Sequence, residues 1–214
     1  MLILCVLQIL LIAFTVTIAW ILLLKLVRHF WKFPIPAILT GLIDNPIRRK
    51  IQPPKTLADR MQLQPDMFIL EVGPGKGTYT FEVAKRVPDG KVIAIDIQES
   101  VVRKLKKKCE ELGITNVEPR IMDVYNLNFD EEVFDRVFLI SCLPEIPDPV
   151  RALKELNRVL KQNGLLCLVE FFPDPDYPLP RTEIKWAKDA GFTLDARHGN
   201  WFIYYLIFSP SNKG

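Results

Sequence analysis

The chain has 214 residues, of which 28 are lysine or arginine and 25 are aspartate or glutamate, and 49% are hydrophobic. This length suits a single domain, and so apolar a composition excludes intrinsic disorder. The four cysteines stand far apart, which argues against a zinc site or a disulfide framework and is typical of a reducing compartment. The two histidines exclude a multi-histidine centre, and we expect no bound metal.

Residues 1–24 contain no charged side chain. As a helix they would extend about 36 Å at about 1.5 Å per residue, enough to cross a hydrocarbon core of about 30 Å. A cleavable signal peptide would need a basic n-region, a shorter apolar stretch and a small-residue cleavage site, and the sequence lacks all three. We therefore predict one transmembrane helix that anchors the chain in a lipid bilayer.

Residues 25–55 carry seven basic side chains against one acidic side chain. By the positive-inside rule, this asymmetry predicts a single-pass protein with the rest of the chain on the cytoplasmic side. Prolines interrupt this connector, and one short apolar helix is expected near 37–43. The run Arg48-Arg49-Lys50 either contacts anionic headgroups or forms a solvated face. No nucleic-acid-binding motif accompanies it, so we expect no nucleic acid partner.

Residues 56–214 are expected to form the globular domain, beginning with a capped helix at 56–63. Short apolar runs then predict strands at residues 67–72, 91–96, 117–123, 135–141 and 165–171. Apolar residues three or four positions apart predict amphipathic helices between these strands, near residues 80–87, 101–112 and 150–160. This alternation indicates an α/β fold of right-handed βαβ units around an open parallel sheet.

The C-terminal part departs from this alternation. A helix at 182–191 is followed by two strand-like runs, 192–198 and 201–208, with Gly199-Asn200 between them. A Gly-Asn pair in this position is a hairpin signal. The predicted sheet therefore has seven strands, is mostly parallel and finishes in an antiparallel pair. A dehydrogenase-type Rossmann sheet does not usually end this way.

Three consecutive predicted strands end in residues suited to one ligand, and ligands of open α/β sheets bind beyond such ends. The first strand leads into GPGKG, whose glycines allow a tight turn, although a glycine loop alone also occurs in ordinary strand-to-helix turns. Pro74 removes a backbone donor and argues against a phosphate cradle. Asp96 could accept hydrogen bonds from ribose hydroxyls, although it could also be a solvated loop residue. Asp123 and Val124 could bind adenine.

These segments resemble motifs of the class I S-adenosylmethionine (SAM)-dependent methyltransferases. ILEVGPGKG, VIAIDIQ and RIMDVYNLNF resemble the first three motifs of that family. Residues 134–170 are similar to the segment between the fourth and fifth strands of quinone-biosynthesis-type methyltransferases. The resemblance covers residues 56–208. It implies a Rossmann-like class I methyltransferase sheet, preceded here by the predicted transmembrane helix, with SAM as the cofactor.

The resemblance implies a set of cofactor-binding residues, namely Glu71, Gly73, Gly75, Gly77, Asp96, Ile97, Asp123, Val124 and Ser141. The three glycines would border the methionine part of SAM, and Glu71 would orient their loop or its bound water. Asp96 would hold the ribose, and Asp123 and Val124 would hold the adenine. Ser141 and Cys142 would lie near the sulfonium.

Methyl transfer from a sulfonium depends mainly on alignment, and a general base is needed only if the acceptor must lose a proton. The catalytic residue is therefore left open, with Glu145, Glu170 and His198 as the candidates. Glu170 could instead bond to loop amides, and His198 could be a plain turn residue. Asp174 and Asp176 could bind a cationic headgroup or a metal, or could cap a turn.

The sequence predicts a membrane-anchored methyltransferase that acts on a hydrophobic or lipid-like small molecule, such as a quinone precursor or a phospholipid headgroup. Apolar residues within 35–43 would help the site open toward the bilayer. The layout also resembles that of membrane-anchored thiol methyltransferases, so a thiol or xenobiotic acceptor is an alternative. A SAM-binding membrane partner without turnover is another alternative, although the complete motifs argue against it. A nicotinamide dehydrogenase is disfavoured by the GxGxG spacing and the terminal hairpin.

Overall fold

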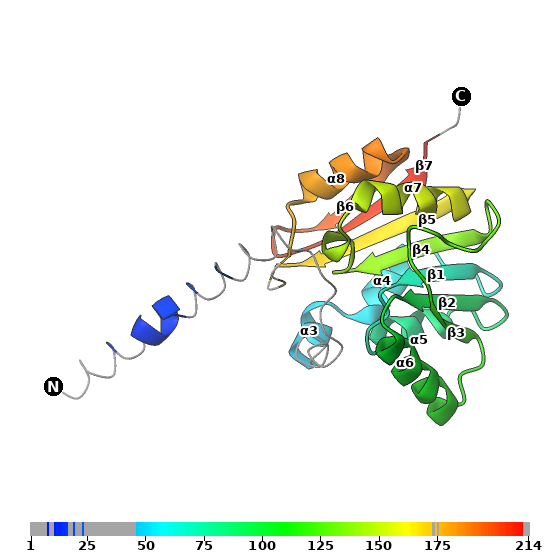
Figure 1. Cartoon of the computed structure of the whole chain (residues 1–214), viewed down its shortest axis with the longest axis horizontal. Helices are drawn as coiled ribbons and strands as arrows, with labels where there is room; N and C mark the ends of the chain where they lie inside the picture. Colours follow the sequence, from blue (N-terminus) through cyan, green and yellow to red (C-terminus); the bar gives the residue numbers. More distant parts are fainter. Residues whose placement is uncertain are drawn as a thin grey trace.

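The computed structural model describes residues 8, 11–16, 19, 23, 46–172, 174 and 176–211 (Figure 1). The strands of the body are β1 (Phe68–Val72), β2 (Lys91–Asp96), β3 (Val117–Ile121), β4 (Phe134–Ile140), β5 (Leu160–Phe171), β6 (Phe192–Gly199) and β7 (Ile203–Pro210). They form one seven-stranded sheet in the order β3-β2-β1-β4-β5-β7-β6. The first five are parallel, and β7 runs antiparallel to both β5 and β6. The predicted sheet and its C-terminal hairpin are confirmed.

Helices cover both faces of this sheet (Figure 1). They are α3 (Pro46–Ile51), α4 (Pro54–Arg60), α5 (Thr78–Ala84), α6 (Glu99–Leu112), α7 (Pro149–Val159) and α8 (Pro180–Asp189), with a short 3-10 helix at Leu143–Glu145. Buried side chains of α4, α5 and α6 pack against one face, and those of α7 and α8 against the other. The central strands are therefore apolar at nearly every position, as expected for strands buried on both sides.

Several element boundaries differ from the predicted ones for local reasons. The third strand ends at Ile121, because Asp123 begins a turn in which its Oδ1 accepts a hydrogen bond from the Tyr125 amide at 2.9 Å. The last strand begins at Ile203, because the Asn200 amide donates to the Ile203 carbonyl at 2.8 Å and closes the hairpin turn. The fifth strand starts already at Leu160, directly after α7.

Part of the basic run in the connector is folded onto the body, and both of our interpretations of the run need correction at Arg48. This side chain is only 7% exposed, whereas Arg49 and Lys50 are exposed. Arg48 belongs to α3, which no sequence pattern had indicated. It therefore cannot act as a headgroup contact or as part of a solvated face, as the run of three basic residues had suggested.

Helix α4, which follows α3, is fixed to the sheet by a buried arginine. Arg136 on β4 donates from Nε to the Met61 carbonyl at 2.6 Å and from Nη2 to the Gln62 carbonyl at 3.3 Å, just after α4 ends. Burial lowers the pKa of Arg136. Carbonyl groups at a helix C-terminus are suitable partners for a cation. This contact holds the segment that carries α3 beside the sheet.

Among the described residues, no helix is both long enough and apolar enough to cross a membrane. Most of the predicted span at residues 1–24, and all of the short helix predicted near 37–43, lie outside the described residues. The transmembrane anchor therefore stays a prediction.

Candidate functional site

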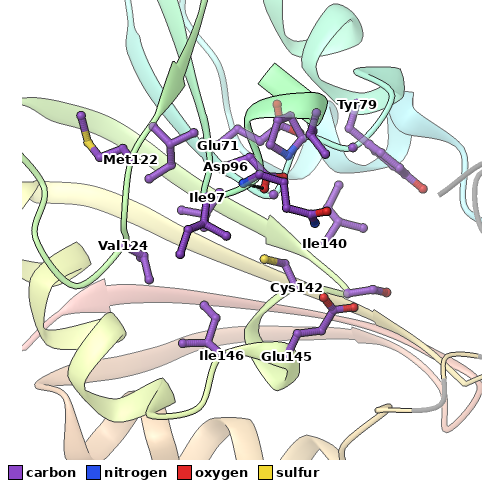
Figure 2. Close-up of a pocket in the computed structure, with 18 of the residues that line it drawn as sticks. Glu71, Tyr79, Asp96, Ile97, Met122, Val124, Ile140, Cys142, Glu145 and Ile146 are labelled. Carbon is purple, nitrogen blue, oxygen red and sulfur yellow. Dashed lines mark hydrogen bonds between the residues drawn. The ribbon is translucent and has the colours of Figure 1, made fainter. Parts of the chain in front are cut away.

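A pocket of about 350 Å³ lies at the carboxyl ends of the central strands (Figure 2). It is centred on the point where β1 lies between β2 and β4, and the connections that follow β1 and β4 run to opposite faces of the sheet. This is the position at which open α/β sheets bind ligands. Eight of the nine predicted cofactor-binding residues line it, namely Glu71, Gly73, Gly75, Asp96, Ile97, Asp123, Val124 and Ser141. Gly77 does not line it.

The glycine loop brings the backbone close to the pocket. Gly73 has φ +74°, and a Cβ atom placed there would lie 2.6 Å from Cys142 Sγ. Gly75 also has a positive φ, of +53°, but no atom lies within 4 Å of its notional Cβ, so this part of the loop faces open space. Gly77 has a packing role instead, because its Cβ would lie 2.5 Å from Leu105 Cδ1 on α6. The GxGxG spacing thus serves both the pocket and the close packing of the loop against α6.

Glu71, at the carboxyl end of β1, is a buried acceptor on the pocket wall. Its side chain is 3% exposed, and Oε2 has no hydrogen-bond partner among the described residues. Burial raises the pKa of Glu71 to about 8, against the lowering effect of the nearby Thr80 hydroxyl and with a further rise from the charge of Asp96. A buried oxygen without a partner is costly unless a ligand supplies a donor. Glu71 therefore fits a ligand that carries an ammonium group.

Asp96 ends β2 in a fixed orientation. Its Oδ1 accepts a hydrogen bond from the Gln98 amide at 2.8 Å, and burial raises the pKa of its carboxyl group. The side chain of Ile97, which is 59% exposed, lines the pocket next to it. A carboxylate beside an apolar side chain can bind a ribose hydroxyl while the apolar side chain contacts a flat base.

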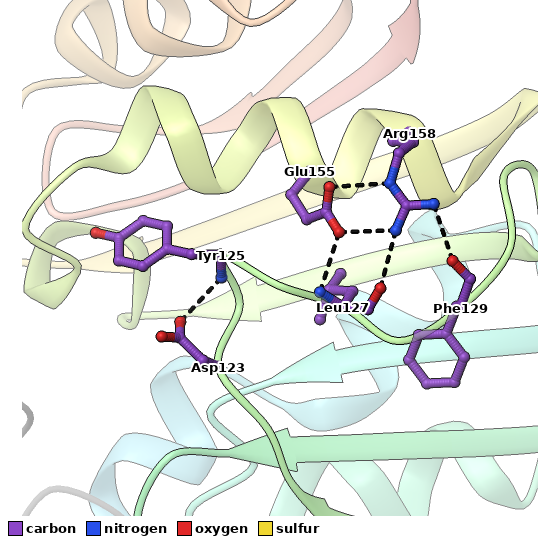
Figure 3. A network of polar contacts seen from close by, with 6 residues as sticks. All are labelled: Asp123, Tyr125, Leu127, Phe129, Glu155 and Arg158. Carbon is purple, nitrogen blue, oxygen red and sulfur yellow. Dashed lines mark hydrogen bonds and ion pairs between the residues drawn. The ribbon is translucent and has the colours of Figure 1, made fainter.

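The segment that follows β3 is held in place by a network of hydrogen bonds from side chains of α7 (Figure 3). Glu155 Oε1 accepts from the Leu127 amide at 3.0 Å, and Arg158 donates to the carbonyls of Leu127 at 2.9 Å and Phe129 at 2.8 Å. Arg158 also pairs with Glu155 at 2.7 Å, and its hydrogen bond lowers the pKa of that carboxyl group. This network fixes the segment that carries Asp123 to the pocket wall.

The end of β4 meets α3 at the pocket. Ser141 has φ +48°, and its Oγ accepts a hydrogen bond from Arg48 Nη2 at 2.9 Å. Arg48 Nε donates to Gln52 Oε1 at 3.1 Å, and Tyr79 OH donates to the Gln52 carbonyl at 3.1 Å. Both Arg48 and Tyr79 line the pocket, and the sequence reasoning missed both. The charge of the basic run was visible in the sequence, but the burial of Arg48 depends on its contact with Ser141, which lies 93 residues further along the chain.

Cys142 follows Ser141 and lies close to Gly73 on the pocket wall (Figure 2). Burial raises the pKa of its thiol well above the ordinary value, with a further rise from the charge of Glu145. The thiol is therefore neutral at physiological pH and is suited to contact rather than to nucleophilic attack.

The three general-base candidates lie in different places. Glu145 lines the pocket (Figure 2). Glu170 does not line it and is only 1% exposed; its carboxyl group lies against that of Glu183 on α8, and its Oε2 has no hydrogen-bond partner among the described residues. His198 is exposed on β6, opposite Tyr205, and is also outside the pocket lining. Of the three, only Glu145 is placed to meet a ligand in this pocket.

The loop after β5 contributes one aspartate to the pocket lining, Asp174. Its Oδ1 accepts from the Asp176 amide at 3.2 Å, as a turn-capping residue does. In the part of the chain that the structure describes, no three His, Cys, Asp or Glu residues are placed to hold a metal ion.

Comparison with known proteins agrees with this geometry. Residues 69–164 match the family described as a methyltransferase domain. Over these residues the chain is similar to methyltransferase domains, in agreement with the resemblance of its motifs to the class I SAM-dependent methyltransferases. A SAM-dependent methyltransferase from Aquifex aeolicus has the same fold, with a TM-score of 0.76 at 24% identity over 82% of this chain and 98% of that chain.

Two curated relatives carry names that specify an acceptor. The chain is 29% identical over 181 residues to 2-methyl-6-phytyl-1,4-hydroquinone methyltransferase 2 of Oryza sativa, covering 76% of this chain and 50% of the relative. It is 33% identical over 121 residues to phosphatidylethanolamine N-methyltransferase of Cereibacter sphaeroides, covering 56% of this chain and 58% of the relative. The chain thus spans about half the length of these relatives.

SAM is the cofactor of this domain family, and the pocket fits it. The unpartnered Oε2 of Glu71 suits an ammonium group, and the open space at Gly75 leaves room beside the glycine loop. Asp96 ends the neighbouring strand with one oxygen fixed by a backbone amide. Eight of the nine residues that the family resemblance implied therefore line this pocket, whereas Gly77 packs against α6.

We predict that SAM binding depends on pH through Glu71. Because the pKa of Glu71 is about 8 in the free protein, its carboxyl group holds a proton at pH 6, whereas the ammonium group of SAM favours the carboxylate. Binding then releases a proton, and the affinity of the full chain should rise by up to about tenfold per pH unit between pH 6 and 7.5. Calorimetric titration at several pH values measures this rise.

The matched variants are Glu71→Gln and Glu99→Gln, the latter on the exposed start of α6. Glu71→Gln should bind SAM more weakly and with little dependence on pH, while Glu99→Gln should follow the unmodified chain. A flat pH profile for the unmodified chain would show that Glu71 does not meet the ammonium group.

A second prediction concerns Glu183, which is fully buried. Burial raises its pKa to about 8, against the lowering effect of the nearby Glu170 and Tyr204 side chains. The folded chain therefore binds this proton more tightly than the unfolded chain, in which the pKa is 4.5. The contribution of this proton to the free energy of unfolding is complete below pH 4.5. It is lost as the pH rises through 8, and the free energy of unfolding falls by up to about 1.4 kcal/mol per pH unit.

Glu183→Gln should weaken this pH dependence and leave the protein more stable than the unmodified chain above pH 8. Urea unfolding of the full chain in detergent at several pH values measures both effects, with Glu99→Gln as the control. If the free energy of unfolding changed equally with pH in Glu183→Gln and in the unmodified chain, the raised pKa of Glu183 would be contradicted.

Proposed function

We propose that the protein is an active, membrane-anchored SAM-dependent methyltransferase that transfers a methyl group to a hydrophobic or lipid-like small molecule. The observation that carries the proposal is the pocket between β1 and β4, which gathers the carboxylates and glycines suited to SAM from three strand ends. The uncharged residues 1–24 support the anchor, and the basic residues after them support a single pass with the domain on the cytoplasmic side.

In this proposal each part of the pocket has one role. SAM supplies a methyl group on a sulfonium, with an excellent leaving group. Glu71 and the glycine loop bind the methionine part, Asp96 binds the ribose, and Asp123 and Val124 bind the adenine. Binding at three strand ends fixes the orientation of the methyl group. Alignment of the methyl group with the acceptor then supplies most of the rate enhancement.

The acceptor would lie on the far side of the sulfonium, next to Ser141, Cys142 and Glu145. The apolar side chains of Ile140 and Ile146 line this part of the pocket and exclude water from it. Glu145 accepts a proton if the acceptor must lose one. Arg48 holds Ser141 in place through its hydrogen bond and closes this end with α3.

The acceptor class rests on the two relatives and on the predicted anchor. The relatives' names specify a phytyl hydroquinone and phosphatidylethanolamine, both of which are lipid-like molecules. An enzyme anchored in the bilayer meets such acceptors at high local concentration. A quinone precursor or a phospholipid headgroup is therefore the proposed acceptor, and the bilayer is the proposed partner, with no nucleic acid involved.

The test uses the full chain in proteoliposomes that contain a total membrane lipid extract, with SAM labelled in its methyl group. We expect label in the organic phase after incubation, and at least about a hundredfold less with Asp96→Ala, because the ribose contact is lost. Transfer to a water-soluble thiol but not to lipid would support the thiol alternative. SAM binding without any transfer would support a non-catalytic partner.

A further inference from the structure

Four aromatic side chains form a cluster at the end of the sheet that carries the pocket. Phe172 and Tyr177 come from the loop after β5, and Trp201 and Phe202 come from the turn between β6 and β7. The ring centroids of Phe172 and Trp201 are 5.2 Å apart, those of Trp201 and Phe202 are 5.7 Å apart, and those of Phe172 and Tyr177 are 5.6 Å apart. We call this cluster the aromatic rim.

The aromatic rim presents unusually large apolar side chains to solvent. Trp201 is 68% exposed and Phe172 is 41% exposed, and the neighbouring Leu179 is 51% exposed. Single exposed apolar residues are common on protein surfaces, but a contiguous group of large ones indicates a contact surface. Trp201 is also the most exposed of the large apolar side chains that the structure describes.

The aromatic rim is held in a fixed shape. Tyr177 OH donates a short hydrogen bond to the Trp201 carbonyl, which ties the loop to the turn. Asn200 Oδ1 accepts from the Phe202 amide at 2.8 Å and stabilises the turn itself. Tyr204 OH donates to the Pro178 carbonyl at 3.0 Å. The exposed rings are therefore presented by an ordered framework.

The aromatic rim also adjoins the mouth of the pocket. The ring of Phe202 packs against Phe171 with centroids 5.1 Å apart, and the guanidinium carbon of Arg48 lies 5.4 Å from the centroid of Phe171. Arg48 lines the pocket, and so does Asp174 from the same loop as Phe172. The loop, the hairpin turn and α3 all lie at one edge of the molecule, on the left in Figure 1.

We propose that the aromatic rim docks onto the surface of a lipid bilayer and places the mouth of the pocket at that surface. The inference rests on the proposed function, because it uses the predicted anchor, and deepens it by assigning the face that meets the membrane. Tryptophan prefers the interface between water and hydrocarbon, where its apolar ring and its polar N–H are both satisfied.

Charge and tether both favour a bilayer over a protein partner. Arg49 and Lys50 are exposed on α3 at the same edge, and basic residues at this position attract anionic headgroups. The connector from 25 to 45 has 21 residues, so it extends at most about 75 Å from the predicted anchor to α3. The edge that carries α3 and the aromatic rim can therefore reach the membrane within the length of this tether.

The test measures whether Trp201 contacts acyl chains in the full chain. The protein is reconstituted in nanodiscs of phosphatidylcholine and phosphatidylglycerol, with or without bromine on the acyl chains, since bromine quenches tryptophan fluorescence on contact. The difference between the unmodified chain and Trp201→Phe gives the signal of Trp201 alone. The matched control is Trp186→Phe, which isolates Trp186 on α8, a partly buried side chain that packs against the core.

We expect brominated lipid to quench the Trp201 signal at least twofold and to leave the Trp186 signal unchanged. An unquenched Trp201 signal would overturn the proposal. A Trp201 signal that changes with protein concentration in lipid-free detergent would also overturn it. Such a change would show that the aromatic rim binds a second copy of the chain. SAM binding is measured on the same samples, so that its loss would count against the proposed function and not against docking.

Discussion

The position of β1 between β2 and β4 is the constraint on which the site depends. Because the connections that follow β1 and β4 run to opposite faces of the sheet, they leave a crevice at the carboxyl ends of these two strands. Glu71, Asp96 and Ser141 reach this crevice from three different strands. Their proximity follows from strand order, since they are 25 and 45 residues apart along the chain.

The surrounding contacts keep these strand ends rigid. The Glu155–Arg158 pair holds the turn after β3 against α7, and Arg136 holds the end of α4 on the opposite side of the sheet. Arg48 then connects α3 to the end of β4. Alignment of a methyl donor with its acceptor requires such rigidity, because small displacements at the reacting atoms carry a large cost in rate.

Much of the fold could be predicted from the sequence, because short apolar runs and helical periodicity alternate clearly after residue 67. The Gly-Asn pair likewise identified the terminal hairpin. The glycine loop and the strand-end aspartates were recognisable because each motif is local. Arg48 and Tyr79 were not recognisable as pocket residues, because their positions follow from long-range contacts that leave no periodic pattern in the sequence. The neighbour of Glu170 could not be predicted for the same reason, because Glu183 lies on a later helix.

Calorimetric titration of the full chain in detergent with S-adenosylhomocysteine, the demethylated form of SAM, tests the central claim most directly. If the pocket between β1 and β4 is the cofactor site, binding should be micromolar or tighter and should be lost in Asp96→Ala. The same variant should unfold at the same denaturant concentration as the unmodified chain. A folded full chain that binds neither this compound nor SAM would contradict the account.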